Sequence, residues 1–123
     1  MKVLTFGIKS ETEIMKEFKS AWAAARGGKS FKRQEGVYFT SLEAARNFLT
    51  PGRMELLHLI RVAKPHSIYS LAKLAKRRFP SVFKDVELLK RHGLVSLARD
   101  KHSARRAITP HVDYGAINLW ISV

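Results

Sequence analysis

Residues 67–97 read SIYSLAKLAKRRFPSVFKDVELLKRHGLVSL, a pattern that predicts two short helices joined by a basic turn. Ser67 suits the position before a helix, and the apolar residues after it recur at the spacing of one buried helix face: Ile68, Leu71, Ala72 and Ala75. The segment from Lys76 to Phe79 interrupts this period. Pro80 fits the first position of a second helix, whose inward stripe is Val82, Val86 and Leu89.

A β-hairpin is predicted directly after these helices. Gly93 suits a left-handed cap at the end of the second helix, and the residues expected in the first strand are Leu94, Val95 and Leu97. Residues 98–106 are polar and basic, and residues 107–109 would form the return strand. Two helices, a short turn and a trailing hairpin predict a winged helix-turn-helix, which is a DNA-binding unit.

The charge of the chain favours a polyanionic partner. The sequence has 23 Lys and Arg against 10 Asp and Glu in 123 residues, a formal net charge of +13. Residues 1–50 hold 9 basic and 5 acidic side chains, whereas residues 51–123 hold 14 and 5. The excess therefore lies in the half that contains the predicted helix-turn-helix; the competing interpretation is a basic surface that only keeps the protein soluble.

Several functional classes find no support in the sequence. The absence of cysteine excludes a disulfide framework, a thiolate zinc site and a cysteine nucleophile. The five histidines form no i, i+4 pair, and there is no phosphate-binding glycine motif. We expect no enzyme, no cofactor and no metal.

The N-terminus shows no apolar leader, and no window approaches the roughly 20 apolar residues of a membrane span. We therefore expect a cytoplasmic, nucleoid-associated protein without a membrane partner.

Before the helix-turn-helix, the sequence predicts a strand over residues 2–8 and a helix over residues 11–26 that opens with Ser10 and Glu13 as a capping box. Ile14, Phe18 and Trp22 share one face of this helix. Core packing is the commoner explanation of such a stripe, and the alternative is a dimer or partner contact. The polar segment 27–36 places a domain boundary near residue 35, giving an extension over residues 1–35 and a DNA-binding domain over residues 36–123.

The remaining segments complete an α+β fold. We expect a short strand over residues 37–39, a two-turn helix after Ser41, and a central scaffold helix over residues 51–63 that begins at Pro51. Residues 116–123 alternate in hydropathy and predict a half-buried strand. Its expected partner is the first strand of the same or of a second subunit.

Residues 71–95, LAKLAKRRFPSVFKDVELLKRHGLV, resemble prokaryotic winged-helix transcriptional regulators of the MarR/ArsR-like kind, which have a closing DVxxLxxxGLV signature. That signature is represented here by Asp85, Val86, Leu89, Gly93, Leu94 and Val95. The resemblance extends to the flanking LTPGRMELL at residues 49–57. Some members are similar to antitoxins, including TumA-like antitoxins, which implies operator binding with autoregulation and a toxin as protein partner.

Two positions depart from this family pattern. Lys76 stands where relatives tend to have glycine in the turn, and Arg78 stands where they tend to have an acidic cap. Loss of a cap costs about 1 kcal/mol of helix stability. Both changes add positive charge beside the expected DNA.

Ser81 and Lys84 lie opposite the inward stripe and are our candidates for base-edge contacts. Pro80 and Phe83 flank them and could touch a thymine methyl group, although core packing is the commoner role for Phe83. The candidates for phosphate contacts are Lys76, Arg77, Arg78, Arg99, Lys101, Arg105 and Arg106. The sequence thus predicts a homodimeric, sequence-specific regulator that binds double-stranded DNA; the alternative is a non-specific nucleic-acid-binding protein of the nucleoid-packaging or RNA-binding kind.

Overall fold

The computed structural model describes residues 1–26, 37–99, 107–121 and 123. The elements in chain order are β1 (Val3–Ile8), α1 (Glu11–Arg26), β2 (Val37–Phe39), α2 (Leu42–Phe48), α3 (Pro51–Ala63), α4 (Ile68–Ala75), α5 (Phe79–Arg91), β3 (Ser96–Arg99), β4 (Ile108–His111) and β5 (Ala116–Ile121). The described residues therefore mix helices and strands, in agreement with the α+β class at this level. They form two units. The first holds residues 1, 3–48 and 116–123, and the second holds residue 2 and residues 49–115.

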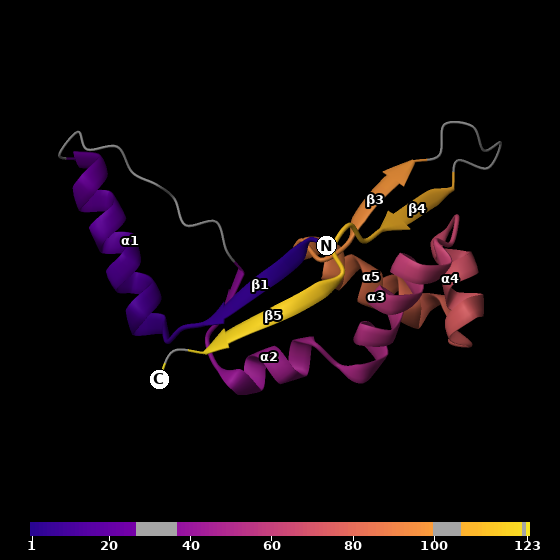
Figure 1. The fold of residues 1–123 in the computed structure, drawn as a ribbon, viewed down its shortest axis with the longest axis horizontal. Helices are drawn as coiled ribbons and strands as arrows, with labels where there is room; N and C mark the ends of the chain where they lie inside the picture. Colours follow the sequence, from indigo (N-terminus) through magenta and orange to yellow (C-terminus); the bar gives the residue numbers. More distant parts are fainter. Residues whose placement is uncertain (27–36, 100–106, 122) are drawn as a thin grey trace. The chain divides into compact units, whose positions relative to one another are not determined.

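The first unit is built on a three-stranded parallel sheet of order β2-β1-β5. β1 pairs along its whole length with β5, from Val3 opposite Ala116 to Ile8 opposite Ile121, and the two strands run side by side in Figure 1. The C-terminal strand thus has the first strand of the same chain as its partner, which confirms one of the two expected pairings.

Helix α2 packs on one face of this sheet through aromatic rings. Phe6 is fully buried, and its ring centroid lies 5.6 Å from that of Phe39, which in turn lies 5.5 Å from Phe48 of α2. Ser41 begins α2 by accepting a hydrogen bond from the Ala44 amide at 3.0 Å. Edge-to-face and tilted ring contacts of this kind add to the stability gained by burying the rings.

The opposite face of the sheet is crossed by Tyr38, Gly7 and Trp120, which are neighbours in the register of β2, β1 and β5. A Cβ atom on Gly7 would lie 2.7 Å from the Tyr38 ring, so only glycine lets the ring lie over the strand. The Nζ atom of Lys9 lies 4.2 Å from the centroid of the same ring.

The boundary predicted near residue 35 falls among residues 27–36, which lie outside the described residues. The contacts that are described group residues 37–48 and β5 with β1. The C-terminal strand therefore belongs with the N-terminal elements, and residues 49–115 form an insertion between α2 and β5.

The second unit is centred on α3, as expected for a scaffold helix. Thr50 caps it by accepting from the Arg53 amide at 3.3 Å, and α3 packs against both α4 and α5. The buried residues of α3 are Leu56, Leu57 and Ile60; those of α4 are Ile68, Leu71 and Ala72; those of α5 are Val82, Val86 and Leu89. Burial of each large aliphatic side chain stabilises the fold by about 2 kcal/mol, so these three stripes hold the helices together.

The hairpin begins later than the sequence predicted. β3 and β4 pair antiparallel from Ser96 opposite His111 to Arg99 opposite Ile108, whereas Leu94 and Val95 lie before the strand and are buried. Their placement in the strand was wrong because the chain first completes the cap of α5. Gly93 has φ +80°, and the Leu94 amide donates to the Leu89 carbonyl at 2.9 Å.

Candidate nucleic-acid interface

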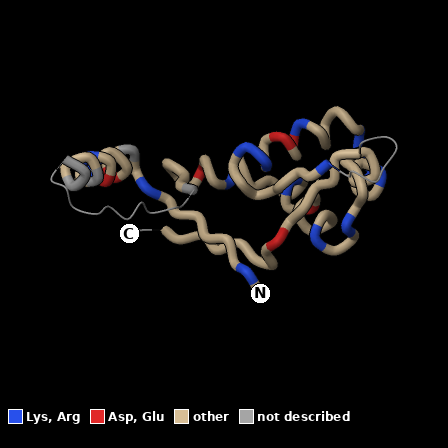
Figure 2. The backbone as a smooth tube through the Cα atoms, turned by 90° about the horizontal axis from the view of Figure 1, so that it is seen from above, with Lys and Arg blue, Asp and Glu red and all other residues tan. Residues whose placement is uncertain are grey.

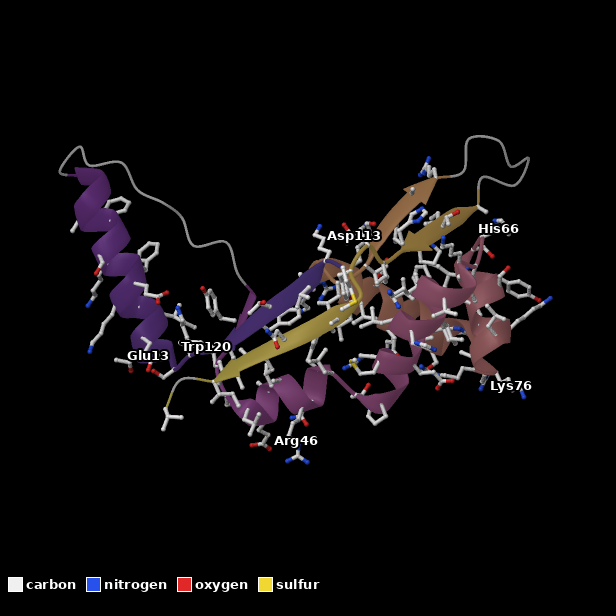
Figure 3. The ribbon with its side chains drawn as sticks, viewed as in Figure 1. Glu13, Arg46, His66, Lys76, Asp113 and Trp120 are labelled. Atoms are coloured by element: carbon white, nitrogen blue, oxygen red, sulfur yellow. The ribbon has the colours of Figure 1, made fainter. Side chains whose placement is uncertain are left out.

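The connection between α4 and α5 is a three-residue turn that starts in a left-handed conformation. Lys76 has φ 55° and ψ 42°. The Lys76 amide donates to the Lys73 carbonyl at 3.2 Å, and the Arg77 amide donates to the Ala72 carbonyl at 3.1 Å. This pair of bonds is a Schellman motif, in which the left-handed position is usually glycine. Figure 3 labels Lys76 at the end of α4, where its exposed side chain extends away from the helices.

Helix α5 begins at Phe79, with Arg78 as its N-cap. Pro80 is thus the second helical residue and not the first, as the sequence had suggested. Arg78 adopts an extended conformation and makes no side-chain cap bond, and its carbonyl accepts from the amides of Ser81 and Val82 at 3.1 and 3.2 Å. The missing side-chain cap agrees with the expectation for an arginine at this position.

The outward face of α5 carries the expected base-contact residues. Ser81 and Lys84 are exposed together with Pro80, whereas Leu88 is half-buried. Arg91 is also exposed, seven residues after Lys84 and therefore on the same side of the helix. Sequence reasoning left Arg91 out, although its spacing from Lys84 would have identified it.

Asp85 of α5 accepts hydrogen bonds from two arginines, one in α3 and one in the turn between α4 and α5. Its Oδ1 atom accepts from Nε of Arg53 in α3 at 3.1 Å, and its Oδ2 atom accepts from Nη2 of Arg77 at 2.7 Å. The exposed fractions of the three side chains are 17%, 20% and 28% for Asp85, Arg53 and Arg77. Asp85 is therefore paired with two basic side chains.

The guanidinium of Arg77 makes its hydrogen bonds within the protein. Its Nη2 atom also donates to Oγ of Ser81 at 2.8 Å, and its Nη1 atom is buried with no hydrogen-bond partner among the described residues. A Cβ atom on Gly52 would lie 3.3 Å from Nη1. The side chain thus lies along α5 and against the start of α3, while its neighbours Lys76 and Arg78 are exposed.

Three aromatic rings form an exposed row beside the recognition candidates. The centroids of Tyr69 and Phe79 are 6.3 Å apart, and those of Phe79 and Phe83 are 5.8 Å apart. Phe83 is 38% exposed, so the interpretation of this residue as core does not hold. Nζ of Lys73 lies 4.7 Å from the Tyr69 ring centroid. The i, i+4 spacing of Phe79 and Phe83 off the buried stripe is the sequence signal for this row, which we had not used.

Figure 2 marks the positions of Lys and Arg in blue along the backbone. The exposed ones around α5 and the hairpin are Lys76, Arg78, Lys84, Lys90, Arg91 and Arg99. The other expected phosphate contacts, Lys101, Arg105 and Arg106, lie outside the described residues. Of the phosphate contacts expected in the hairpin, Arg99 lies within the described residues, at the last position of β3.

Tyr114 anchors the chain after the hairpin. Its hydroxyl donates to the Leu94 carbonyl at 2.8 Å, and the side chain is buried. Burial raises the pKa of Tyr114 to about 12, with a smaller contribution from the charge of Asp113. Asp113 itself pairs with Lys2 at 2.9 Å, and this hydrogen bond lowers the pKa of the Asp113 carboxyl.

In the first unit, helix α1 exposes the residues that were expected to contact a partner. Phe18 is 62% and Trp22 59% exposed, and Ile14 is half-buried. The competing expectation, core packing of this stripe, is not what the structure shows for Phe18 and Trp22. Glu17 on the same helix accepts a hydrogen bond from Lys9, which raises the pKa of the lysine.

Within the described residues, no group of three or more His, Cys, Asp or Glu side chains could hold a metal ion. No helix in the described part of the chain is long and apolar enough to cross a membrane.

The helices and the hairpin described above lie in a segment that matches the model of a known protein family. The model of the HVO_A0114 family matches residues 48–119, and the chain belongs to this family. No curated protein matches the chain. The matched range contains α3, α4, α5 and the hairpin, whereas β1, α1 and β2 lie before it.

Proposed function

We propose that the chain is a sequence-specific regulator that binds double-stranded DNA, and that its second unit acts as a winged helix-turn-helix. In this proposal α5 enters the major groove and the β3–β4 hairpin is the wing. The observation that carries it is the outward face of α5, where Ser81 and Lys84 are exposed directly after a turn with the exposed cations Lys76 and Arg78. The resemblance to MarR/ArsR-like regulators supports the same assignment.

The exposed residues divide by the contact that their chemistry allows. Lys84 and Ser81 can donate to base edges, and Pro80 and Phe83 can contact a thymine methyl group. Lys76, Arg78 and Arg99 are suited to phosphates, which supply affinity but carry no sequence information. Arg77 is no longer among the proposed phosphate contacts, because its guanidinium is bonded to Ser81 and Asp85.

The test is selection of bound duplexes from a random library, followed by fluorescence anisotropy on the selected duplex and on a scrambled duplex at several salt concentrations. We expect a selected inverted repeat, as bound by a homodimer, and a preference of about 1,000-fold or more over scrambled DNA. The duplex upstream of the protein's own gene is included because an autoregulatory protein would bind it. A preference near one would instead support the alternative, non-specific binding of DNA or RNA.

A second proposal concerns helix α1, whose exposed Phe18 and Trp22 favour a contact with another protein. The contact would be with a second copy of the chain or, if the protein acts as an antitoxin, with a toxin. Co-expression with the product of the adjacent gene tests the antitoxin role. Copurification that is lost on Trp22→Ser supports it, and the absence of a complex with a toxic neighbour contradicts it.

A further inference from the structure

The hydroxyl of Ser81 is already used as a hydrogen-bond acceptor within the protein. Nη2 of Arg77 donates to Oγ of Ser81 at 2.8 Å, and the Ser81 side chain is otherwise exposed on the outward face of α5. No acceptor for the Ser81 hydroxyl hydrogen occurs among the residues that the structure describes. The O–H bond is therefore free to donate away from the protein.

The position of Arg77 is fixed by groups on two other segments. The same Nη2 atom donates to Asp85 at 2.7 Å, and Asp85 is held in turn by Arg53 of α3 at 3.1 Å. The remaining Nη1 atom is buried close to Gly52. Because Nη2 of Arg77 is bonded to Asp85 and Nη1 is buried, the guanidinium has a defined place in the folded state, and its bond to Ser81 follows from that place.

A hydroxyl that accepts from a cation becomes a stronger donor, since hydrogen bonds in a chain polarise one another. The nearby positive charge also opposes the approach of a second donor to the remaining lone pair. Ser81 is therefore biased towards acceptor atoms. Lys84, one helical turn further on, carries an ammonium group that can only donate.

We propose that Arg77 is a positioning residue that fixes Ser81 as a donor, so that Ser81 and Lys84 each read a guanine in the major groove. Guanine presents two acceptors there, O6 and N7, and no donor. Thymine presents one acceptor, O4, beside its methyl group, cytosine presents the N4 donor, and adenine presents one acceptor and one donor. This inference rests on the proposed DNA-binding function of α5. It adds the class of base that the site selects and gives Arg77 a role without a phosphate contact.

The experiment repeats the library selection with the wild type, Ser81→Ala, Ser81→Thr, Arg77→Gln and Lys84→Ala. The base pair whose preference is flattened by Ser81→Ala identifies the Ser81 position, and Lys84→Ala identifies the Lys84 position. We expect guanine at both positions in the wild type and a loss of about tenfold in preference at the Ser81 position in Ser81→Ala. Ser81→Thr retains the hydroxyl and should retain the preference.

Arg77→Gln is the decisive variant. It should relax the guanine preference at the Ser81 position while its affinity for scrambled duplex changes less than threefold. Thermal unfolding shows whether it folds, and Arg77→Met, which has no group that can donate to Ser81, is the second variant with the same expectation. The inference is overturned if either folded variant keeps the preference that Ser81→Ala loses, or if the Ser81 position selects cytosine, adenine or thymine. A wild type that selects no sequence at all would instead reject the proposed function.

Discussion

Lys76 occupies a backbone conformation that L-amino acids rarely adopt, and it does so at the turn before the proposed recognition helix. Its φ of 55° brings Cβ close to the following carbonyl oxygen, a contact that glycine avoids. Strained residues of this kind concentrate at functional sites. The side chain is therefore of more use to the protein for its charge than for its effect on the turn.

We predict that Lys76→Gly raises the free energy of unfolding by about 1 kcal/mol and weakens binding to selected and scrambled duplexes alike. The salt dependence of binding should fall by about one phosphate contact. Chemical denaturation and anisotropy measure the two effects.

Lys64 supplies the matched control, because it ends α3 with a φ of 48°. Lys64→Gly should stabilise the protein similarly and leave DNA binding unchanged. Equal loss of DNA affinity in both variants would contradict a specific role for the Lys76 charge.

Tyr114 allows a prediction of pH dependence. Its pKa is raised to about 12 from an ordinary value near 10, so the neutral hydroxyl stabilises the folded state. This stabilisation is complete below pH 10 and is lost as the pH rises through 10 towards 12. We expect the difference in unfolding free energy between wild type and Tyr114→Phe to be about 1 kcal/mol at pH 8 and to shrink above pH 10. Urea denaturation over this range measures it, and a constant difference would argue against the titration of Tyr114.

In the proposed complex with DNA, base contacts and phosphate contacts would come from different positions along α5. Lys84→Ala should weaken binding to the selected duplex by about 1 to 3 kcal/mol and relax one base position. Arg78→Ala, at the N-cap, should weaken selected and scrambled duplexes equally, because a phosphate contact is independent of sequence. Competition anisotropy measures both, and identical profiles for the two variants would show that the division between base and phosphate contacts is wrong.

Local signals predicted the helices well. Ser10, Ser41 and Ser67 cap the helices that they were expected to begin, because an N-cap bond joins residues only three apart. The inward stripes of α4 and α5 were also correct at most positions. The hairpin start was misplaced because burial, and not strand pairing, explains the apolar character of Leu94 and Val95.

The arrangement around Arg77 could not be read from the sequence. Asp85 and Arg53 are 32 residues apart, so their bond depends on how α3 packs against α5. A run of three basic residues at 76–78 suggests three equivalent phosphate contacts, yet the fold turns the middle one inward. Only tertiary packing distinguishes Arg77 from its neighbours.

At the scale of the whole molecule, the charge excess and the order of two short helices followed by a hairpin were visible in the sequence, but the division into units was not. Parallel pairing of β1 with β5 joins residues more than 100 positions apart, and no local pattern specifies it. The exposure of α1 was likewise undecided between core packing and partner contact, because both give an amphipathic helix.

We predict that the double variant Phe18→Ser, Trp22→Ser is monomeric in solution, whereas the wild type is a dimer. The substitutions remove exposed aromatic surface and should leave the rest of the fold intact, as checked by circular dichroism. Lys16→Ser, an exposed residue on the other side of α1, is the control and should remain dimeric. Sedimentation equilibrium gives the masses, and a monomeric wild type or a dimeric double variant would exclude α1 as the dimer contact.

The pairing of β1 with β5 has a consequence for the order of folding on the ribosome. β1 is made first and is the middle strand of its sheet, but its longest partner ends at Ile121. The sheet therefore cannot be completed until residues 116–121 have emerged, whereas every residue of the second unit from 49 to 115 is available earlier. During synthesis one edge of β1 stays unpaired until β5 is made. We therefore expect nascent chains halted before residue 116 to aggregate or to recruit chaperones.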